Sequence, residues 1–138
     1  MNRPRTLVPL ALILLTGCGP SPYSPVRGVV QYPGGTPATD LAGGQVVFEA
    51  NGPDGRAVTA TGVIGPDGRF QLTAVTPGDG TVPGPNRCLV TNPPAPAEGP
   101  ARRAIDAKYE SFDTSGLSFD VTTGANEFTV VVERAAGR

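Results

Sequence analysis

Clusters of glycine and proline divide this chain into short segments, and they constrain its fold more than any other feature. The 138 residues include 19 glycines and 16 prolines, and both residue types weaken the interior of helices and strands. Between the clusters, apolar residues alternate with polar ones, as in strands that bury one face. The pattern therefore predicts an all-β domain of short strands joined by turns rather than a disordered chain.

Seven segments show this alternation, and together they predict a β-sandwich whose core is formed by the one-sided aliphatic faces. Between residues 101 and 108 the pattern allows one short helical turn and no longer helix. The predicted strands cover residues 26–32, 45–50, 57–64, 70–75, 86–90, 117–122 and 127–133.

The sequence Gly-Pro-Asp-Gly-Arg occurs twice, at residues 52–56 and 65–69. Pro-Asp-Gly favours a tight turn because proline presets φ, aspartate bonds the nearby backbone and glycine accepts positive φ. The two turns predict that residues 46–75 form a meander of three antiparallel strands. The alternative, a calcium site at the Asp-Gly pairs, lacks the closely spaced acidic residues that calcium needs.

The first residues of the chain have the features of a secretory signal. Arg3 and Arg5 precede an apolar run over residues 7–15, which is too short to span a bilayer as a helix. The sequence Leu15-Thr16-Gly17-Cys18 closely resembles the lipobox of bacterial lipoproteins. This resemblance implies cleavage between Gly17 and Cys18 and attachment of fatty acids, such as palmitate, to Cys18; an ordinary secreted protein is the alternative.

The resemblance also implies a division of the chain and a location in the cell. Residues 1–17 would be the signal peptide, residues 18–25 a lipidated, proline-rich tether of about 20 Å, and residues 26–134 the folded domain. Acyl chains on Cys18 would make the membrane a stable partner. Gly19 stands where similar lipoproteins retained in the inner membrane usually carry aspartate, so the resemblance favours the outer membrane of the cell envelope.

The residue types argue against catalysis. The chain has no histidine, which is the commonest general base and the usual zinc ligand. The turn carboxylates Asp54, Asp67 and Asp79 have an adequate structural explanation in their turns. We therefore expect no enzyme, no catalytic residue, no metal site and no cofactor. With 11 basic and 12 acidic residues, and no basic patch, nucleic acid is excluded as a partner.

Two further features concern binding. Cys88 has no partner in the chain once Cys18 carries lipid, and its position on a predicted strand indicates a small buried hydrophobe rather than a reactive thiol. Residues 91–100 form a proline-rich excursion without a core face, and they are the segment we expect to make external contacts. Individual ligand-binding residues cannot be assigned from the sequence.

The order of strand and turn motifs resembles small envelope lipoproteins with a carboxypeptidase regulatory-like, or transthyretin-like, domain. Asn86 departs from the pattern, since similar proteins often carry an aromatic residue there. The motifs that carry the resemblance are Val26-x-Gly28-x-Val30, Gly44-x-Val46-x-Phe48, Gly62, Asp67-Gly68-x-Phe70-x-Leu72, Gly78-Asp79-Gly80-x-x-Pro83-Gly84, Ile105-x-x-Lys108-Tyr109, Ser115-x-Leu117, Val121 and Gly124-x-Asn126-x-Phe128.

This resemblance implies a seven-stranded Greek-key β-sandwich of the transthyretin (prealbumin) type, which is Ig-like in architecture and has no catalytic residues of its own. The expected function is that of a lipid-anchored structural or protein-interaction module whose partner is an envelope protein or a glycan. The alternative is an accessory module that binds a peptide or carbohydrate ligand. Fold alone does not decide between them.

Overall fold

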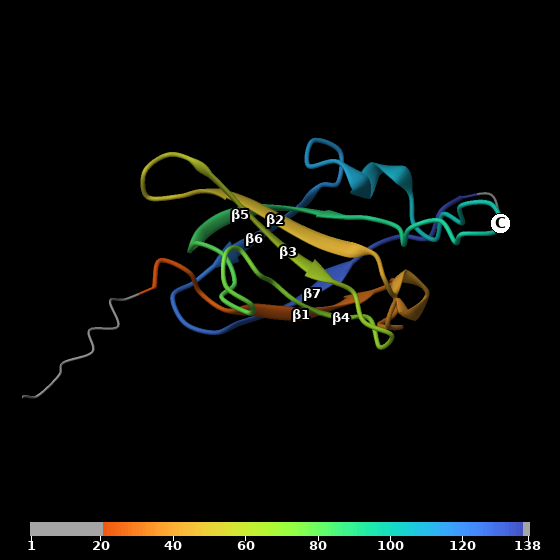
Figure 1. Cartoon of the computed structure of the whole chain (residues 1–138), viewed down its shortest axis with the longest axis horizontal. Helices are drawn as coiled ribbons and strands as arrows, with labels where there is room; N and C mark the ends of the chain where they lie inside the picture. The colour runs from red at the N-terminus through yellow and green to blue at the C-terminus, as the bar shows by residue number, and fades with distance from the viewer. Residues whose placement is uncertain (1–20, 137–138) are drawn as a thin grey trace, which may run out of the picture.

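Two β-sheets packed face to face form the body of the protein (Figure 1). The computed structural model describes residues 21–136. The expectation of an all-β sandwich is confirmed, and each predicted strand overlaps an observed one. The elements are β1 (Val26–Gln31), η1 (Thr39–Leu41), β2 (Gln45–Asn51), β3 (Ala57–Val63), β4 (Arg69–Gln71), β5 (Gly84–Val90), η2 (Ala107–Glu110), β6 (Leu117–Val121) and β7 (Asn126–Val131), where η denotes a 3₁₀ helix.

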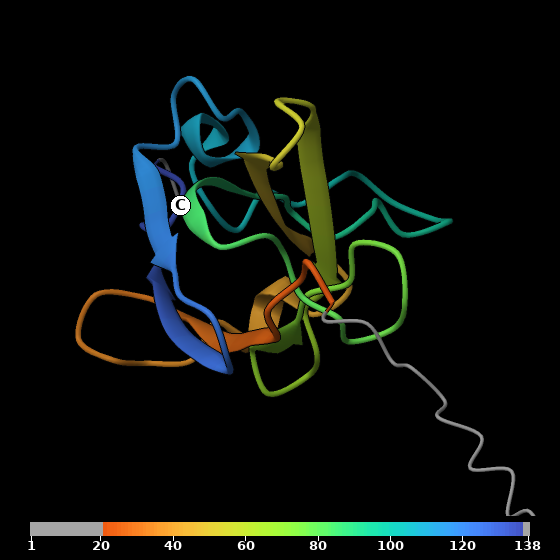
Figure 2. The same cartoon turned by 90° about the vertical axis from the view of Figure 1, so that its left-hand side faces the viewer.

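The strands are divided between a three-stranded sheet in the order β4-β1-β7 and a four-stranded sheet in the order β3-β2-β5-β6. In the smaller sheet β1 is antiparallel to β4 and parallel to β7. Neighbours in the larger sheet are all antiparallel. Figure 2 views the sandwich from the end at which residue 21 lies.

The predicted three-stranded meander is wrong in its last step. β2 and β3 form the expected hairpin, but β4 lies in the other sheet, where Phe70 is paired with Gly28 of β1. The segment after β4 is joined to β3 by an isolated bridge, in which Thr61 and Thr73 exchange two backbone hydrogen bonds of 3.0 Å. Alternation predicts which side chains face the core, but it does not predict which strand accepts the backbone hydrogen bonds.

The strand predicted for residues 70–75 is shorter, because the carboxylate of Asp79 binds the backbone that follows it. Asp79 accepts the N–H groups of Ala74, Val75 and Thr76 at 2.7, 3.1 and 2.8 Å. Burial alone would raise the pKa of Asp79, but these backbone donors lower it below its ordinary value. The segment from residue 74 therefore forms a loop around Asp79 rather than a ladder.

The predicted helical turn is displaced towards the C-terminus. Instead of lying within residues 101–108, it is η2, whose first turn is capped by the Asp106 side chain accepting the N–H of Lys108 at 2.9 Å. Ile105 is extended, bridges to Arg134 and is fully buried. Because this apolar side chain is needed in the core, the helix begins only after it. η1 was not predicted.

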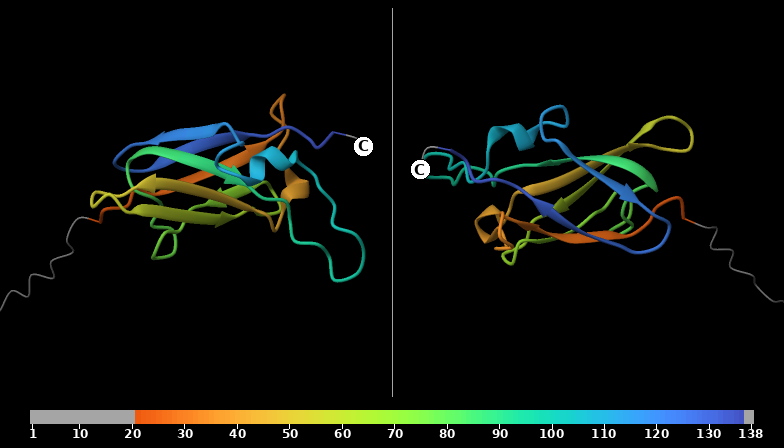
Figure 3. Two further views of the ribbon diagram at one scale, coloured as in Figure 1. Left: turned by 90° about the horizontal axis from the view of Figure 1, so that it is seen from above. Right: turned by 180° about the vertical axis from the view of Figure 1, so that it is seen from behind.

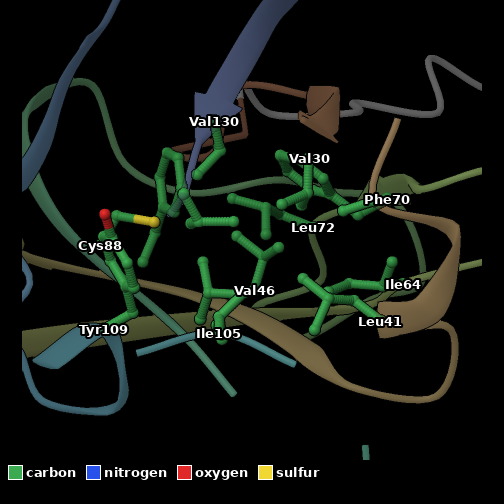
Figure 4. Packing of buried hydrophobic residues seen from close by; sticks show 14 of the residues in the cluster. Val30, Leu41, Val46, Ile64, Phe70, Leu72, Cys88, Ile105, Tyr109 and Val130 are labelled. Carbon is green, nitrogen blue, oxygen red and sulfur yellow. The ribbon is translucent and has the colours of Figure 1, made fainter. Parts of the chain in front are cut away.

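Inward-facing residues of both sheets meet in one hydrophobic core (Figure 4). Phe48 of β2 is fully buried and stacks on Phe119 of β6 with ring centroids 5.3 Å apart. The ring centroid of Phe128 in β7 lies 6.2 Å from that of Phe48. These three phenylalanines therefore form an aromatic cluster that includes residues of both sheets. The alternating faces are confirmed by the buried residues Val26, Val30, Tyr32, Val46, Phe48, Ala50, Phe70, Leu72, Cys88, Val90, Val121, Val130 and Val132.

Asn86 also points into the core, although it is polar. It is fully buried, and its amide nitrogen donates to the carbonyls of Val82 and Gly84 at 3.1 and 3.0 Å. Its amide oxygen accepts the Thr81 hydroxyl at 3.0 Å. A buried polar group is costly only when it is left unpaired. Because the Asn86 amide makes three hydrogen bonds, the core accommodates it as part of a polar cluster.

The N-terminal segment joins the sandwich before residue 26. Ser24 is buried and exchanges backbone hydrogen bonds of 2.7 and 3.1 Å with Thr81. The carbonyl of Pro25 accepts the N–H of Asn126 at 2.8 Å. Part of the segment expected to be a tether is thus bound to the body, whereas Gly17 and Cys18 lie outside the described residues. Among residues 21–136, no helix has the length and apolar character needed to cross a bilayer.

Candidate functional site

The segment of residues 93–103, named here the proline loop, projects from the end of the sandwich opposite residue 21 (Figure 3). It follows β5 and returns to the core at Ile105. Every residue from Pro94 to Arg103 is exposed. The expectation that residues 91–100 lack a core face is therefore confirmed from Pro94 onward, whereas Thr91, Asn92 and Pro93 are half-buried.

One side chain holds the two ends of the proline loop together. The amide oxygen of Asn92 accepts the backbone N–H groups of Ala104 and Ile105 at 2.6 and 3.1 Å. Its amide nitrogen donates to Glu110 of η2 at 3.1 Å. The loop therefore leaves and re-enters the body at one point, as in an Ω-loop.

Glu110 strengthens this closure. One of its carboxylate oxygens accepts from both the backbone N–H and the amide of Asn92, at 3.3 and 3.1 Å. The other lies 3.8 Å from the guanidinium of Arg103. Since η2 positions Glu110, the base of the proline loop is fixed by tertiary structure, and no local pattern in the sequence indicates this contact.

The residues in the first half of the proline loop have little conformational freedom. Proline fixes φ near −65° at positions 93, 94 and 96, and a residue that precedes proline is restricted to extended conformations. Residues 92–96 lie outside any strand, and residues 97–99 form a bend. Gly99, with φ of +110°, then reverses the chain, and this conformation favours glycine.

Two cavities lie where the proline loop meets the body. A cavity of about 250 Å³ is lined by Pro93, Pro94, Pro96, Asp40, Arg102 and Ala104. A second, of about 240 Å³, is lined by Asn92, Pro93, Ala101, Arg102, Arg103 and Glu110. Pro93 borders both cavities and Pro94 and Pro96 border the first, so the arrangement is suited to surface recognition.

A polar cluster beside this loop joins residues that are distant in sequence. The hydroxyl of Tyr32 donates to one oxygen of Asp40 at 2.5 Å, and Arg134 donates to the other at 3.1 Å. The guanidinium carbon of Arg134 also lies 3.7 Å from the centroid of the Tyr32 ring, a cation–π distance. Sequence analysis missed this cluster because only the tertiary fold brings its three members together.

Two other surfaces are hollowed. A groove of about 670 Å³ lies at the end near residue 21, where Tyr23, Pro53 and Val82 contribute to its lining. Another, of about 580 Å³, lies against the three-stranded sheet, where Arg27, Arg69 and Glu127 contribute.

Within the described chain, β6 and β7 each have a strand neighbour on one side only, so both present sheet edges.

The turn aspartates lie on separate turns. Asp54 and Asp67 accept the N–H groups of Arg56 and Arg69 at 3.0 and 3.1 Å. Gly55 and Gly68 have φ of 79° and 80°, so the turn interpretation of both Pro-Asp-Gly sequences is confirmed. Within residues 21–136, no group of three acidic, histidine or cysteine side chains is arranged to hold a metal.

Cys88 is buried, as expected, with its sulfur 3.7 Å from the carbonyl oxygen of Leu89 (Figure 4). Burial raises the pKa of its thiol to about 12. We expect iodoacetamide at about pH 8 to leave Cys88 unmodified in the native protein and to alkylate it after unfolding in urea, because the thiolate is the nucleophile. Mass spectrometry of both samples measures this. Rapid alkylation of the native protein would contradict the buried position.

Comparisons with known proteins do not assign a family. No family model matches this chain, and no curated protein matches it. A solved DUF3823 family protein from Parabacteroides merdae is similar at 18% identity and a TM-score of 0.47, over 83% of this chain and 48% of that chain. A leucine-rich repeat protein from Bacteroides thetaiotaomicron is similar at 13% identity and a TM-score of 0.38, over 82% of this chain and 12% of that chain. This chain thus spans about half the length of the first protein.

Proposed function

We propose that this protein is a non-catalytic lipoprotein of the cell envelope that acts as a protein-interaction module. Fatty acids on Cys18 would moor it to a membrane, and the outer membrane is favoured over the inner because Gly19 follows the cysteine. The lipobox resemblance supports the anchor, and the absence of histidine from the sequence supports a role without catalysis.

The observation that carries this proposal is the position of the proline loop relative to the start of the domain. Residue 21 lies at one end of the sandwich and the loop at the other (Figures 1 and 3). The six residues of β1 run between these ends, which places the loop about 20 Å or more beyond the start of the strand. An anchor at residue 18 therefore directs the exposed prolines away from the bilayer, where a partner protein can reach them.

We also infer that the sandwich is the seven-stranded Greek-key fold of transthyretin-like, carboxypeptidase regulatory-like domains. The order β3-β2-β5-β6 supports it, because β2 and β5 are neighbours although β4 intervenes in the chain and lies in the other sheet. The chain also crosses between the sheets after β6, because β7 pairs in parallel with β1 in the smaller sheet. Domains of this kind resemble accessory modules, which agrees with a function in binding.

Metabolic labelling with a radioactive or clickable fatty acid tests the anchor. The protein is expected to take up label and to fractionate with membranes, and Cys18→Ala is expected to abolish both. Cys88→Ala is the matched control and should keep the label, since Cys88 is buried in the core. Unlabelled wild-type protein, recovered free of the membrane after removal of its leader, would refute the anchor.

A further inference from the structure

We infer that the proline loop is a preformed polyproline II ligand for a partner protein that has an aromatic-lined groove flanked by acidic side chains. This inference rests on the proposed function as an interaction module and specifies the partner's chemistry. It does not depend on the lipid, because every residue that it uses lies in the folded domain.

The spacing of the prolines matches this mode of recognition. Polyproline II has three residues per turn and rises about 3.1 Å per residue, so Pro93 and Pro96 lie on the same ridge about 9 Å apart. Aromatic-lined grooves bind such P-x-x-P segments by receiving the prolines between their rings. Pro94, Ala95, Pro96 and the following Ala97 are exposed, so the ridge is available along most of its length.

The base of the loop reduces the entropy that binding costs. Asn92 holds the returning chain through hydrogen bonds to Ala104 and Ile105, and Glu110 holds Asn92 through two further bonds. The two ends of the loop are therefore held together before the partner arrives, and the prolines between them restrict the backbone further. A preformed ligand loses less conformational freedom on binding than a flexible one, which makes a clamped loop a better ligand than a free tail of the same sequence.

Charge indicates the second feature of the partner. Arg102 is exposed and lines both cavities at the proline loop. Arg102 belongs to the returning half of the loop, and it lines one cavity together with Pro93, Pro94 and Pro96. A carboxylate at the rim of the partner's groove would pair with it, and opposite charges at a rim mainly increase association rate and specificity.

Site-specific photo-crosslinking in the cells that make the full-length protein tests this inference. A benzophenone amino acid replaces Ala97 in one sample and Ala125, exposed in the loop between β6 and β7, in the control. We expect a discrete protein adduct from position 97 and none of that mass from position 125. The crosslinked peptide of the partner should contain aromatic residues, together with nearby aspartate or glutamate.

Substitutions and a peptide identify the contact. Pro93→Ala/Pro96→Ala should decrease the adduct about fivefold or more, an effect typical of residues that dominate an interface. Pro53→Ala/Pro77→Ala, at exposed prolines outside the loop, should leave the yield unchanged.

A synthetic peptide of residues 92–103 should compete for the partner, and a scrambled peptide without the P-x-x-P spacing should not. Arg102→Glu should also reduce the adduct, whereas Arg56→Glu should not.

Four other outcomes would contradict the proposed recognition of the proline loop. An adduct that persists in Pro93→Ala/Pro96→Ala, or a partner site without aromatic residues, overturns the polyproline interpretation. An adduct from position 125, with none from position 97, overturns it while leaving the interaction module in place. No protein adduct from any of these positions would contradict both proposals. Circular dichroism of each variant shows whether a lost adduct reflects unfolding instead.

Discussion

Replacing Gly80 with alanine is expected to destabilise the domain by about 4 kcal/mol or more, an effect that only a few mechanisms can cause. Gly80 has φ of +90°, and a Cβ at this position would lie 1.8 Å from the carbonyl oxygen of Ser24. That oxygen belongs to backbone that is held in place, because Ser24 and Thr81 exchange two hydrogen bonds. The clash can be relieved only by separating the N-terminal segment from the loop before β5.

Gly124→Ala is the matched control for this substitution. Gly124 also has positive φ, at +99°, but no atom lies within 4 Å of a Cβ built on it. Its cost should be limited to that of the left-handed conformation, about 1–2 kcal/mol. Urea denaturation of residues 21–138, followed by circular dichroism, measures the free energy of unfolding of both variants. Equal midpoints would show that the approach of Ser24 to Gly80 does not occur in solution.

Phe48→Ala should produce the second largest loss, about 3–5 kcal/mol. Phe48 is fully buried, so its removal leaves a cavity between the sheets. It also stacks on Phe119 with an interplanar angle of 5°, and such pairs contribute about 0.5–1.5 kcal/mol beyond the area they bury. Its ring centroid also lies 6.2 Å from that of Phe128 in β7 of the other sheet, so the substitution weakens contacts to both sheets at once.

Phe112→Ala removes the same side chain from a partly exposed position. Phe112 lies between η2 and β6, where the Arg87 guanidinium is 5.1 Å from its ring centroid. A cation–π contact near the surface contributes about 0.5–1 kcal/mol, so Phe112→Ala should be much milder than Phe48→Ala. The same denaturation experiment compares them. A loss at Phe48 no larger than that at Phe112 would contradict the placement of Phe48 between the sheets.

The site was predicted less completely than the fold. The lack of a core face in the proline loop follows from its composition, because no apolar alternation marks residues 92–100. Its clamp could not be predicted in this way. Asn92 and Glu110 are separated by a proline-rich excursion and a short helix, and nothing local to either residue indicates that their side chains meet.

The cluster of Tyr32, Asp40 and Arg134 shows the same limit. Tyr32 was expected at a strand end, and it lies directly after β1. Its hydroxyl, however, donates a hydrogen bond to Asp40, and the guanidinium of Arg134, near the other end of the chain, lies over its ring. Periodicity predicts that a side chain is buried, but it contains no information about which distant polar group will satisfy that side chain.

The sequence by itself determined the class of fold, the inward face of each strand and the tight turns, because two-residue alternation and the backbone preferences of glycine, proline and aspartate act over a few residues. Only the tertiary structure decided that β4 leaves the sheet of β3 and that Asn92 closes the proline loop. These depend on hydrogen bonds between segments that meet only when the two sheets pack together. Such bonds are specified by the whole fold and not by any one segment.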